Sequence, residues 1–113
     1  MDNKITQNKA EILKALAHPT RLNILESLRR GERCVCEIID DVNIEQSNVS
    51  QHLAVLKKIG ILTHRKDGLR VIYKVKHDEI FKILSLLDSL ISRQMEETMA
   101  ILDGLRQKRA GSN

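Results

Sequence analysis

The sequence predicts a mostly α-helical fold that carries one small β-hairpin. Apolar residues recur at intervals of three and four through most of the chain, which is the period of an amphipathic helix. Between residues 61 and 76 the period changes to two, and Asp67-Gly68 in this stretch is a strong signal for a hairpin turn. A chain of 113 residues can bury a modest core, and we expect a single domain over residues 1–113.

Two helices are predicted before the central part of the chain. The first covers residues 4–17 and has a narrow apolar stripe. His18-Pro19 ends it, because the residue before a proline disfavours the helical conformation. Thr20 is the expected cap of the second helix, which ends at Gly31.

Residues 34–60 predict a helix-turn-helix. A short helix from Cys34 to Val42 is joined through Asn43 to a second helix that ends at Gly60. The apolar stripe of the second helix consists of Val49, Leu53 and Leu56. Its other side carries amides, hydroxyls and cations, which suit base edges and phosphates, so we expect this to be a recognition helix.

Residues 61–76 predict a two-stranded hairpin directly behind the recognition helix. In its second strand an apolar set alternates with a more polar one: Leu69, Val71, Tyr73 and Val75 against Arg70, Ile72, Lys74 and Lys76. A hairpin of two strands is marginally stable alone, so in this position we interpret it as the wing of a winged helix-turn-helix. Arg65, Lys66 and Arg70 are expected near its tip, within reach of the DNA backbone or minor groove.

Residues 78–107 predict one long helix. Its apolar positions are Ile80, Leu84, Leu87, Ile91, Met95, Leu102 and Leu105. A continuous helix of this length spans on the order of 45 Å, more than so small a domain can cover. We therefore expect a homodimer through the first and last helices, and a disordered end at residues 108–113.

The charge is concentrated on the predicted DNA-binding segment. Residues 44–77 carry seven basic and two acidic side chains, whereas the whole chain has a net charge of only +4. With aromatic residues at 2%, stacking on unpaired bases is disfavoured, and double-stranded DNA is the expected partner. No apolar run approaches membrane-spanning length and no signal peptide is evident, which predicts a cytoplasmic protein.

Eight residues are predicted to contact DNA. The candidates on the recognition helix are Ser47, Asn48, Ser50, Gln51 and His52, and the candidate phosphate contacts are Lys57, Arg65 and Arg70. For His52 the alternative is that it positions the helix. No catalytic triad, phosphate loop or convergent carboxylate pair occurs at usable spacing, so we do not expect an enzyme.

The order of these elements resembles the ArsR/SmtB-type winged-helix regulators. The matching segments are Leu16-Ala17-His18-Pro19-Thr20-Arg21-Leu22, Val49-Ser50-Gln51-His52-Leu53 and Arg65-Lys66-Asp67-Gly68 with Tyr73. The resemblance covers residues 10–92. It implies a homodimeric repressor that needs no cofactor to bind its DNA operator and leaves it when an inducer binds.

Cys34 and Cys36 are the only cysteines, and their segment resembles the thiol sensor of the arsenic- and cadmium-responsive branch of that family. Thiolates are soft ligands suited to As(III), Sb(III), Cd(II), Pb(II) or Zn(II). With Val35, Ile38 and Ile39 facing the core, both cysteines are expected outside the apolar stripe. Residues two apart do not share a helix face, so one ion bound by both would distort the first helical turn.

The ligand inventory favours As(III) or Sb(III). Two thiols cannot complete a tetrahedral Zn(II) or Cd(II) site, whereas As(III) takes three ligands and could accept a small cellular thiol as the third. One alternative keeps the DNA-binding repressor and makes Cys34 and Cys36 a redox or reactive-sulfur switch. A more remote alternative is a winged-helix module whose basic face binds an acidic protein.

Overall fold

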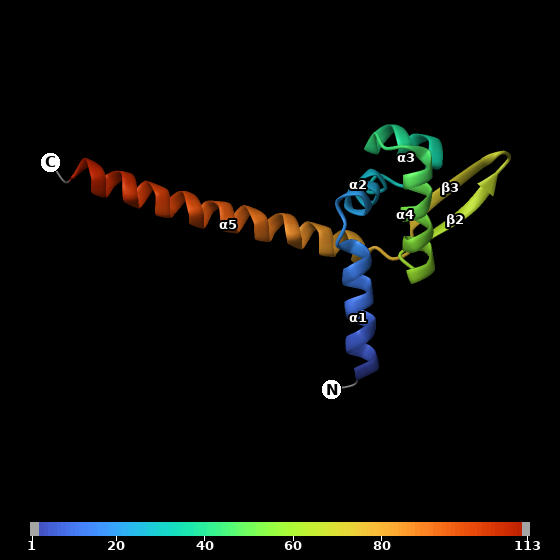
Figure 1. The fold of residues 1–113 in the computed structure, drawn as a ribbon, viewed down its shortest axis with the longest axis horizontal. Coiled ribbons are helices and arrows are strands. Elements are labelled where there is room, and N and C mark those ends of the chain that lie inside the picture. The colour runs from blue at the N-terminus through green and yellow to red at the C-terminus, as the bar shows by residue number, and fades with distance from the viewer. Residues whose placement is uncertain (1–2, 112–113) are drawn as a thin grey trace. The chain divides into compact units, whose positions relative to one another are not determined.

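The computed structural model describes residues 3–111 (Figure 1). The chain forms two compact units, one up to Ile80 and one from Phe81 onward, so the extent of the predicted single domain stays a prediction. The elements are α1 (Asn3–Leu16), α2 (Pro19–Ser27), β1 (Arg33–Cys34), α3 (Val35–Val42), α4 (Gln46–Ile59), β2 (Leu62–Asp67), β3 (Arg70–Val75) and α5 (Glu79–Ala110). Within the described residues, no helix has the length and apolarity that crossing a membrane requires.

The break between α1 and α2 lies where the sequence predicted it, but the cap is a different residue. His18 has an extended backbone, and its Nδ1 accepts a hydrogen bond from Thr20 N at 3.1 Å. Pro19 occupies the first helical position, where its missing N–H costs nothing. The prediction that Thr20 caps α2 was therefore wrong. His18 is the N-cap, and its imidazole accepts the Thr20 N–H.

The helix-turn-helix is formed by α3 and α4. Asn43 ends α3 in the left-handed conformation with φ of 54°, and Gly60 ends α4 with φ of 89°. Both are residue types that tolerate a left-handed backbone, so the sequence marks both ends. The apolar stripe of α4 is buried in full, and it packs with α1, α2 and α3 in the first unit.

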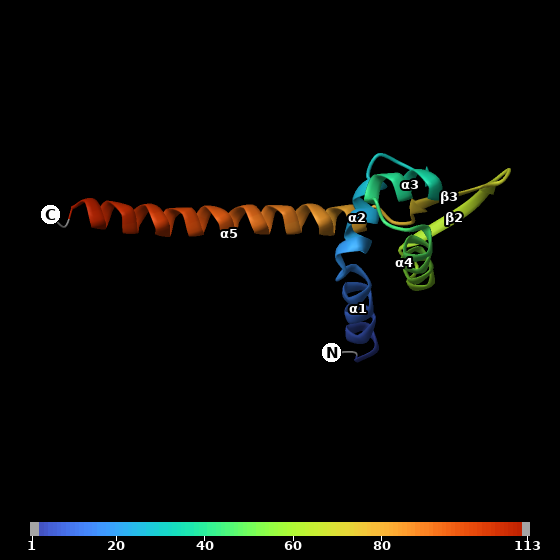
Figure 2. The ribbon, with the colours of Figure 1, turned by 45° about the horizontal axis from the view of Figure 1, so that its top comes forward.

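The wing is a three-stranded antiparallel sheet with the order β1-β3-β2, which confirms a mostly helical fold with a small β wing. The β2–β3 hairpin turns at Gly68 with φ of 64° and projects past α3 and α4 in both Figure 1 and Figure 2. The two residues of β1 were not predicted as a strand. Arg33 pairs with Tyr73 and Cys34 with Ile72, so β1 ties the start of α3 to the wing.

The buried side of β3 is not the one that the apolar alternation in the sequence predicted. Ile72, which belongs to the more polar set, is the buried residue of the strand, whereas Leu69 is fully exposed at the turn. The core of the first unit is aliphatic. Its most deeply buried members are Ile24, Leu25, Leu28, Ile38, Val49, Leu53 and Leu56, together with Cys34.

The second unit consists of the rest of α5, a continuous helix to Ala110. The predicted disordered end was wrong for residues 108–110, which continue the helix, and residues 112–113 lie outside the described part. Many large apolar side chains of α5 are exposed: Leu86, Leu87, Leu90, Ile91, Met95, Met99, Ile101, Leu102 and Leu105. A surface of this kind is unusual for a monomer and is typical of a protein interface.

Candidate DNA-binding surface and thiol site

The outer face of α4 presents four of the predicted base-contacting residues. Ser47, Asn48, Ser50 and Gln51 are exposed, while Val49 between them is buried. Their polar groups are therefore directed away from the core on the helix that follows the turn. Hydroxyls and amides at such positions can donate to and accept from base edges in a major groove.

His52, the fifth residue of that set, is half-buried and contacts the start of α2. Its Nδ1 accepts a hydrogen bond from Arg21 Nε at 3.1 Å, and its ring lies 4.4 Å from the ring of His18. Burial lowers the pKa of His52 below its ordinary value of 6.5, and the nearby His18 and Arg21 lower it further. His52 thus joins α4 to the start of α2.

The cations predicted to meet phosphates are exposed but paired. Arg65 on β2 contacts the Glu32 carboxylate through Nη2 at 2.6 Å and Nε at 3.2 Å. The hydrogen bond from Arg65 lowers the pKa of Glu32, and the same bond raises the pKa of Arg65. Lys57 Nζ lies 3.4 Å from His64 Nε2. These contacts are at the surface, so phosphates can compete for the cations.

Cys34 and Cys36 are joined by a disulfide, with their Cα atoms 5.3 Å apart. Cys34 is the N-cap of α3, has an extended backbone and is only 2% exposed, whereas Cys36 lies in the first turn and is exposed. The expectation that both lie outside the buried surface was therefore wrong for Cys34, which β1 places beside Ile72 of β3. Cys34 lies just outside the helix, so its sulfur reaches Cys36 with α3 intact in the disulfide form. The distortion of the first turn by a bound ion stays a prediction.

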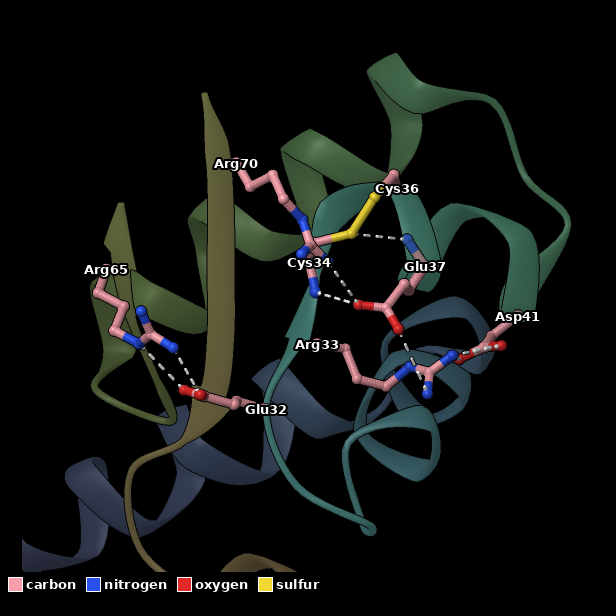
Figure 3. A network of polar contacts seen from close by, with 8 residues as sticks. All are labelled: Glu32, Arg33, Cys34, Cys36, Glu37, Asp41, Arg65 and Arg70. Carbon is pink, nitrogen blue, oxygen red and sulfur yellow. Dashed lines mark hydrogen bonds and ion pairs between the residues drawn. A yellow bond between two sulfur atoms is a disulfide. The ribbon is translucent and has the colours of Figure 1, made fainter. Parts of the chain in front are cut away.

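Glu37 connects the disulfide to the wing (Figure 3). Cys34 Sγ accepts the Glu37 N–H at 3.2 Å, and Glu37 Oε1 accepts the Cys34 N–H at 3.0 Å, which forms a capping box. The same Oε1 lies 3.2 Å from Arg70 Nη2 on β3. Arg33 forms ion pairs with two carboxylates of α3, at 2.9 Å from Asp41 and 3.8 Å from Glu37.

A cavity of about 480 Å³ lies beside the disulfide. It is lined by both cysteines, by residues of α3 and α4, and by the wing: Val35, Ile39, Gln46, Ser50, Leu53, Leu69, Arg70, Val71 and Tyr73. Burial raises the pKa of Tyr73, so its phenol remains a neutral donor. The cavity thus brings the predicted sensor cysteines, two polar α4 side chains and a wing arginine to one place.

Residues 3–111 contain no group of three or more His, Cys, Asp or Glu side chains that could enclose a metal ion. Cys34 and Cys36 are the two soft donors that the sequence proposed. Glu32 and Glu37 were missed by sequence reasoning. Glu37 had a signal, since it follows the helix cap by three residues as in a capping box, with cysteine in place of serine or threonine.

The family model described as "Bacterial regulatory protein, arsR family" matches residues 18–64, which include the helix-turn-helix and the first part of the wing. Among proteins of similar sequence, the uncharacterised HTH-type transcriptional regulator Rv0081 of Mycobacterium tuberculosis is 39% identical over 99 residues, which are 87% of each chain. The arsenical resistance operon repressor of Staphylococcus xylosus is 35% identical and aligns over 68% of this chain and 74% of its own.

Solved structures agree with the sequence matches. The crystal structure of Mycobacterium tuberculosis Rv0081 superposes with a TM-score of 0.78 at 35% identity, covering 87% of this chain and 99% of that one. The homodimeric winged helix-turn-helix DNA-binding domain of Mb0332 from Mycobacterium bovis superposes with a TM-score of 0.76 at 28% identity, covering 86% of this chain and 92% of that one.

Proposed function

The chain belongs to the arsR family of bacterial regulatory proteins, and from this premise we propose that it acts in the cytoplasm as a homodimeric repressor controlled at Cys34 and Cys36. It is a DNA-binding transcriptional regulator and not an enzyme. The observation that carries the proposal is the exposed polar face of α4 beside a wing whose arginines are held only by surface ion pairs.

Ser47, Asn48, Ser50 and Gln51 are assigned to base edges, because they are among the exposed polar side chains of the first turns of α4. An α-helix in the major groove reads bases with its N-terminal part, while cations on neighbouring elements fix its register on the backbone. Lys57, Arg65 and Arg70 are assigned to phosphates. We assign His52 to positioning of α4, since Arg21 already occupies its Nδ1.

The dimer is supported by the exposed apolar side chains of both terminal helices. Ile5, Ile12 and Leu13 are exposed on α1, in addition to the apolar surface of α5. The related Mb0332 domain is homodimeric. A two-fold dimer presents two copies of α4, so the operator should contain two inverted half-sites about one helical turn of DNA apart.

The first effector proposed is As(III) or Sb(III). Reduced Cys34 and Cys36 would supply two thiolates from positions where the sulfurs already meet, and a small thiol in the adjoining cavity would supply the third. Soft thiolate donors match this ion class, whereas tetrahedral Cd(II) or Zn(II) would need further donors that residues 3–111 do not cluster here. The similar Staphylococcus xylosus protein is an arsenical resistance operon repressor.

The second effector proposed is oxidation, which the Cys34–Cys36 disulfide specifically favours. Both effectors link the two sulfurs, one through an ion and one directly. Linking them fixes the cap of α3 and keeps the Glu37 carboxylate where it holds Arg70. Arg70 then contributes less to phosphate binding, so linked sulfurs lower the affinity for DNA.

The test of the DNA-binding proposal is fluorescence anisotropy on a labelled duplex from the upstream region of the protein's own gene. We expect the reduced protein to bind this duplex more tightly than a shuffled duplex, by at least about a thousandfold, with affinity that falls steeply as salt rises. Equal, weak binding to both duplexes would contradict the proposal and would favour the module that binds an acidic protein.

A further inference from the structure

We propose that the Cys34–Cys36 disulfide is a modification site for a small thiol that carries a carboxylate, and that the thiol is joined to Cys36. This inference rests on the proposed redox control of the same site. It adds which sulfur is attacked, which one leaves and what kind of thiol the cavity accepts.

Accessibility selects the sulfur that is attacked. Cys36 is exposed and lines the cavity of about 480 Å³, whereas Cys34, paired with Ile72 of β3, is 2% exposed. An attacking thiolate must approach a disulfide sulfur directly, so access decides which of the two reacts. The cavity is large enough to hold a small thiol beside Cys36.

The hydrogen bonds select the sulfur that leaves. Cys34 Sγ accepts the Glu37 N–H at 3.2 Å, at the N-terminus of α3, where the helix dipole favours negative charge. A thiolate that is stabilised in this way is the better leaving group. Accessibility and leaving-group stability therefore point to the same direction of exchange.

The reaction is an exchange of one disulfide for another. The small thiol loses its proton to water, and its thiolate sulfur forms a bond with Cys36 Sγ. The Cys34–Cys36 bond breaks, and its electron pair remains on Cys34 Sγ as a thiolate. A second small thiolate then attacks the sulfur of the first, which releases Cys36 as a thiolate and forms the symmetric disulfide of the small thiol.

The lining of the cavity selects an anionic thiol. Arg70 is the cationic side chain among the lining residues, and Ser50, Gln46 and Tyr73 add hydrogen-bonding groups. A carboxylate can pair with the Arg70 guanidinium while its thiol is directed at Cys36. A neutral thiol lacks this contact, and an amine-bearing thiol would be repelled.

The direct test maps the adduct on the oxidised wild-type protein in the absence of DNA. The protein is treated with 3-mercaptopropionate, quenched with acid, alkylated with N-ethylmaleimide and digested with trypsin. Cleavage after Arg33 gives a peptide that begins with Cys34, so fragment ions separate the two cysteines. We expect the mercaptopropionyl group on Cys36 and the maleimide on Cys34, with about a tenfold preference. An equal or reversed distribution would overturn the assignment.

Single-cysteine variants provide a second measurement. Reduced Cys34→Ser and Cys36→Ser proteins are treated with the symmetric disulfide of 3-mercaptopropionate, and we expect the variant that retains Cys36 to react about tenfold faster. Equal rates in two variants that are folded by circular dichroism would contradict the role of burial.

The thiol class is tested with Arg70→Gln. The ratio of the exchange rates with 3-mercaptopropionate and 2-mercaptoethanol is compared between this variant and the wild type, so intrinsic thiol reactivity cancels. We expect the ratio to fall about three- to tenfold in the variant. An unchanged ratio would refute carboxylate selection. Because no DNA is present, failure of the repressor proposal would leave all three results unaffected.

Discussion

Arg70 Nη2 lies 3.2 Å from Glu37 Oε1, and these two residues are 33 positions apart in the sequence. The same carboxylate oxygen accepts the Cys34 N–H, so the wing arginine and the disulfide share one partner. A change at the cysteines can therefore alter the ion pair of Arg70, a residue that we assign to a phosphate contact.

Replacing Glu37 with glutamine should tighten DNA binding. The change removes the charge that holds Arg70 while it keeps an oxygen near the Cys34 N–H, so Arg70 can pair with phosphate at lower cost. We expect about a two- to fivefold higher affinity in the disulfide form, where Glu37 holds Arg70, as fits an exposed ion pair. Anisotropy on the operator duplex measures it, and Glu26→Gln, whose carboxylate pairs with Arg29, is the matched control. Weaker binding by Glu37→Gln would contradict this role of the pair.

Base recognition and phosphate binding should separate in a second pair of variants. Gln51→Ala should relax the preference between operator and shuffled duplexes, because it removes a base contact. Arg70→Ala should weaken binding to every duplex and reduce the slope of log affinity against log salt by about one. The measurement is a salt titration on both duplexes. Losses of equal size on all duplexes from both variants would show the assignment to be wrong.

The sulfur of Cys34 should stabilise α3 as a helix cap. In reduced protein, serine at this position keeps an acceptor for the Glu37 N–H and alanine does not. We expect Cys34→Ala to be less stable to urea than Cys34→Ser by about 1 kcal/mol, although alanine is the more apolar residue. If Cys34→Ala were the more stable of the two, burial and not capping would be the function of this side chain.

Acid should destabilise the fold through His52. Its pKa is lower in the folded protein than the ordinary value of 6.5, so the unfolded chain binds more protons as the pH falls below 6.5. Stability is therefore full above 6.5 and is lost as the pH falls through the folded pKa. We expect Tm to fall between about pH 7.5 and pH 5.5. His52→Gln should flatten this dependence, whereas the control His77→Gln, at an exposed position, should retain it.

A charge on the apolar surface of α5 should dissociate the proposed dimer. Ile91 is 50% exposed, and Ile91→Glu would place a carboxylate in the interface. Ser89 lies two positions earlier, on another face of the helix, and Ser89→Glu is the control. Light scattering after size exclusion should show a monomer for Ile91→Glu and a dimer for Ser89→Glu. A dimer in both would remove this surface from the interface.

The local elements were predictable from the sequence because their signals are local. The apolar period placed α4, and Asn43 and Gly60 marked helix ends at positions where the backbone is left-handed. The Asp67-Gly68 pair likewise located the turn between β2 and β3. The polar face of α4 follows from the same period, so most candidate base contacts could be placed on it before the fold was known.

The connection between the cysteines and the wing could not be predicted from local pattern. It depends on β1, which has only two residues and exists because Arg33 and Cys34 pair with residues of β3 that lie 40 and 38 positions later. That pairing buries Cys34, which a helical period alone placed outside the core. It also brings Glu37 to Arg70 and makes Ile72 the inward residue of β3. Long-range pairing, which no short spacing encodes, thus determines the electrostatics of the site.

The most direct test of the account is the operator affinity of one protein in three states: disulfide, reduced, and reduced with As(III). Cys36→Ser, which cannot link two sulfurs, is measured beside it. We predict that the reduced wild type binds at least about tenfold more tightly than the other two states, in keeping with a coupling of about 1 to 3 kcal/mol. Cys36→Ser should bind equally under all three conditions. Equal affinities for all wild-type states, or full release of Cys36→Ser by As(III), would contradict control of DNA binding at Cys34 and Cys36.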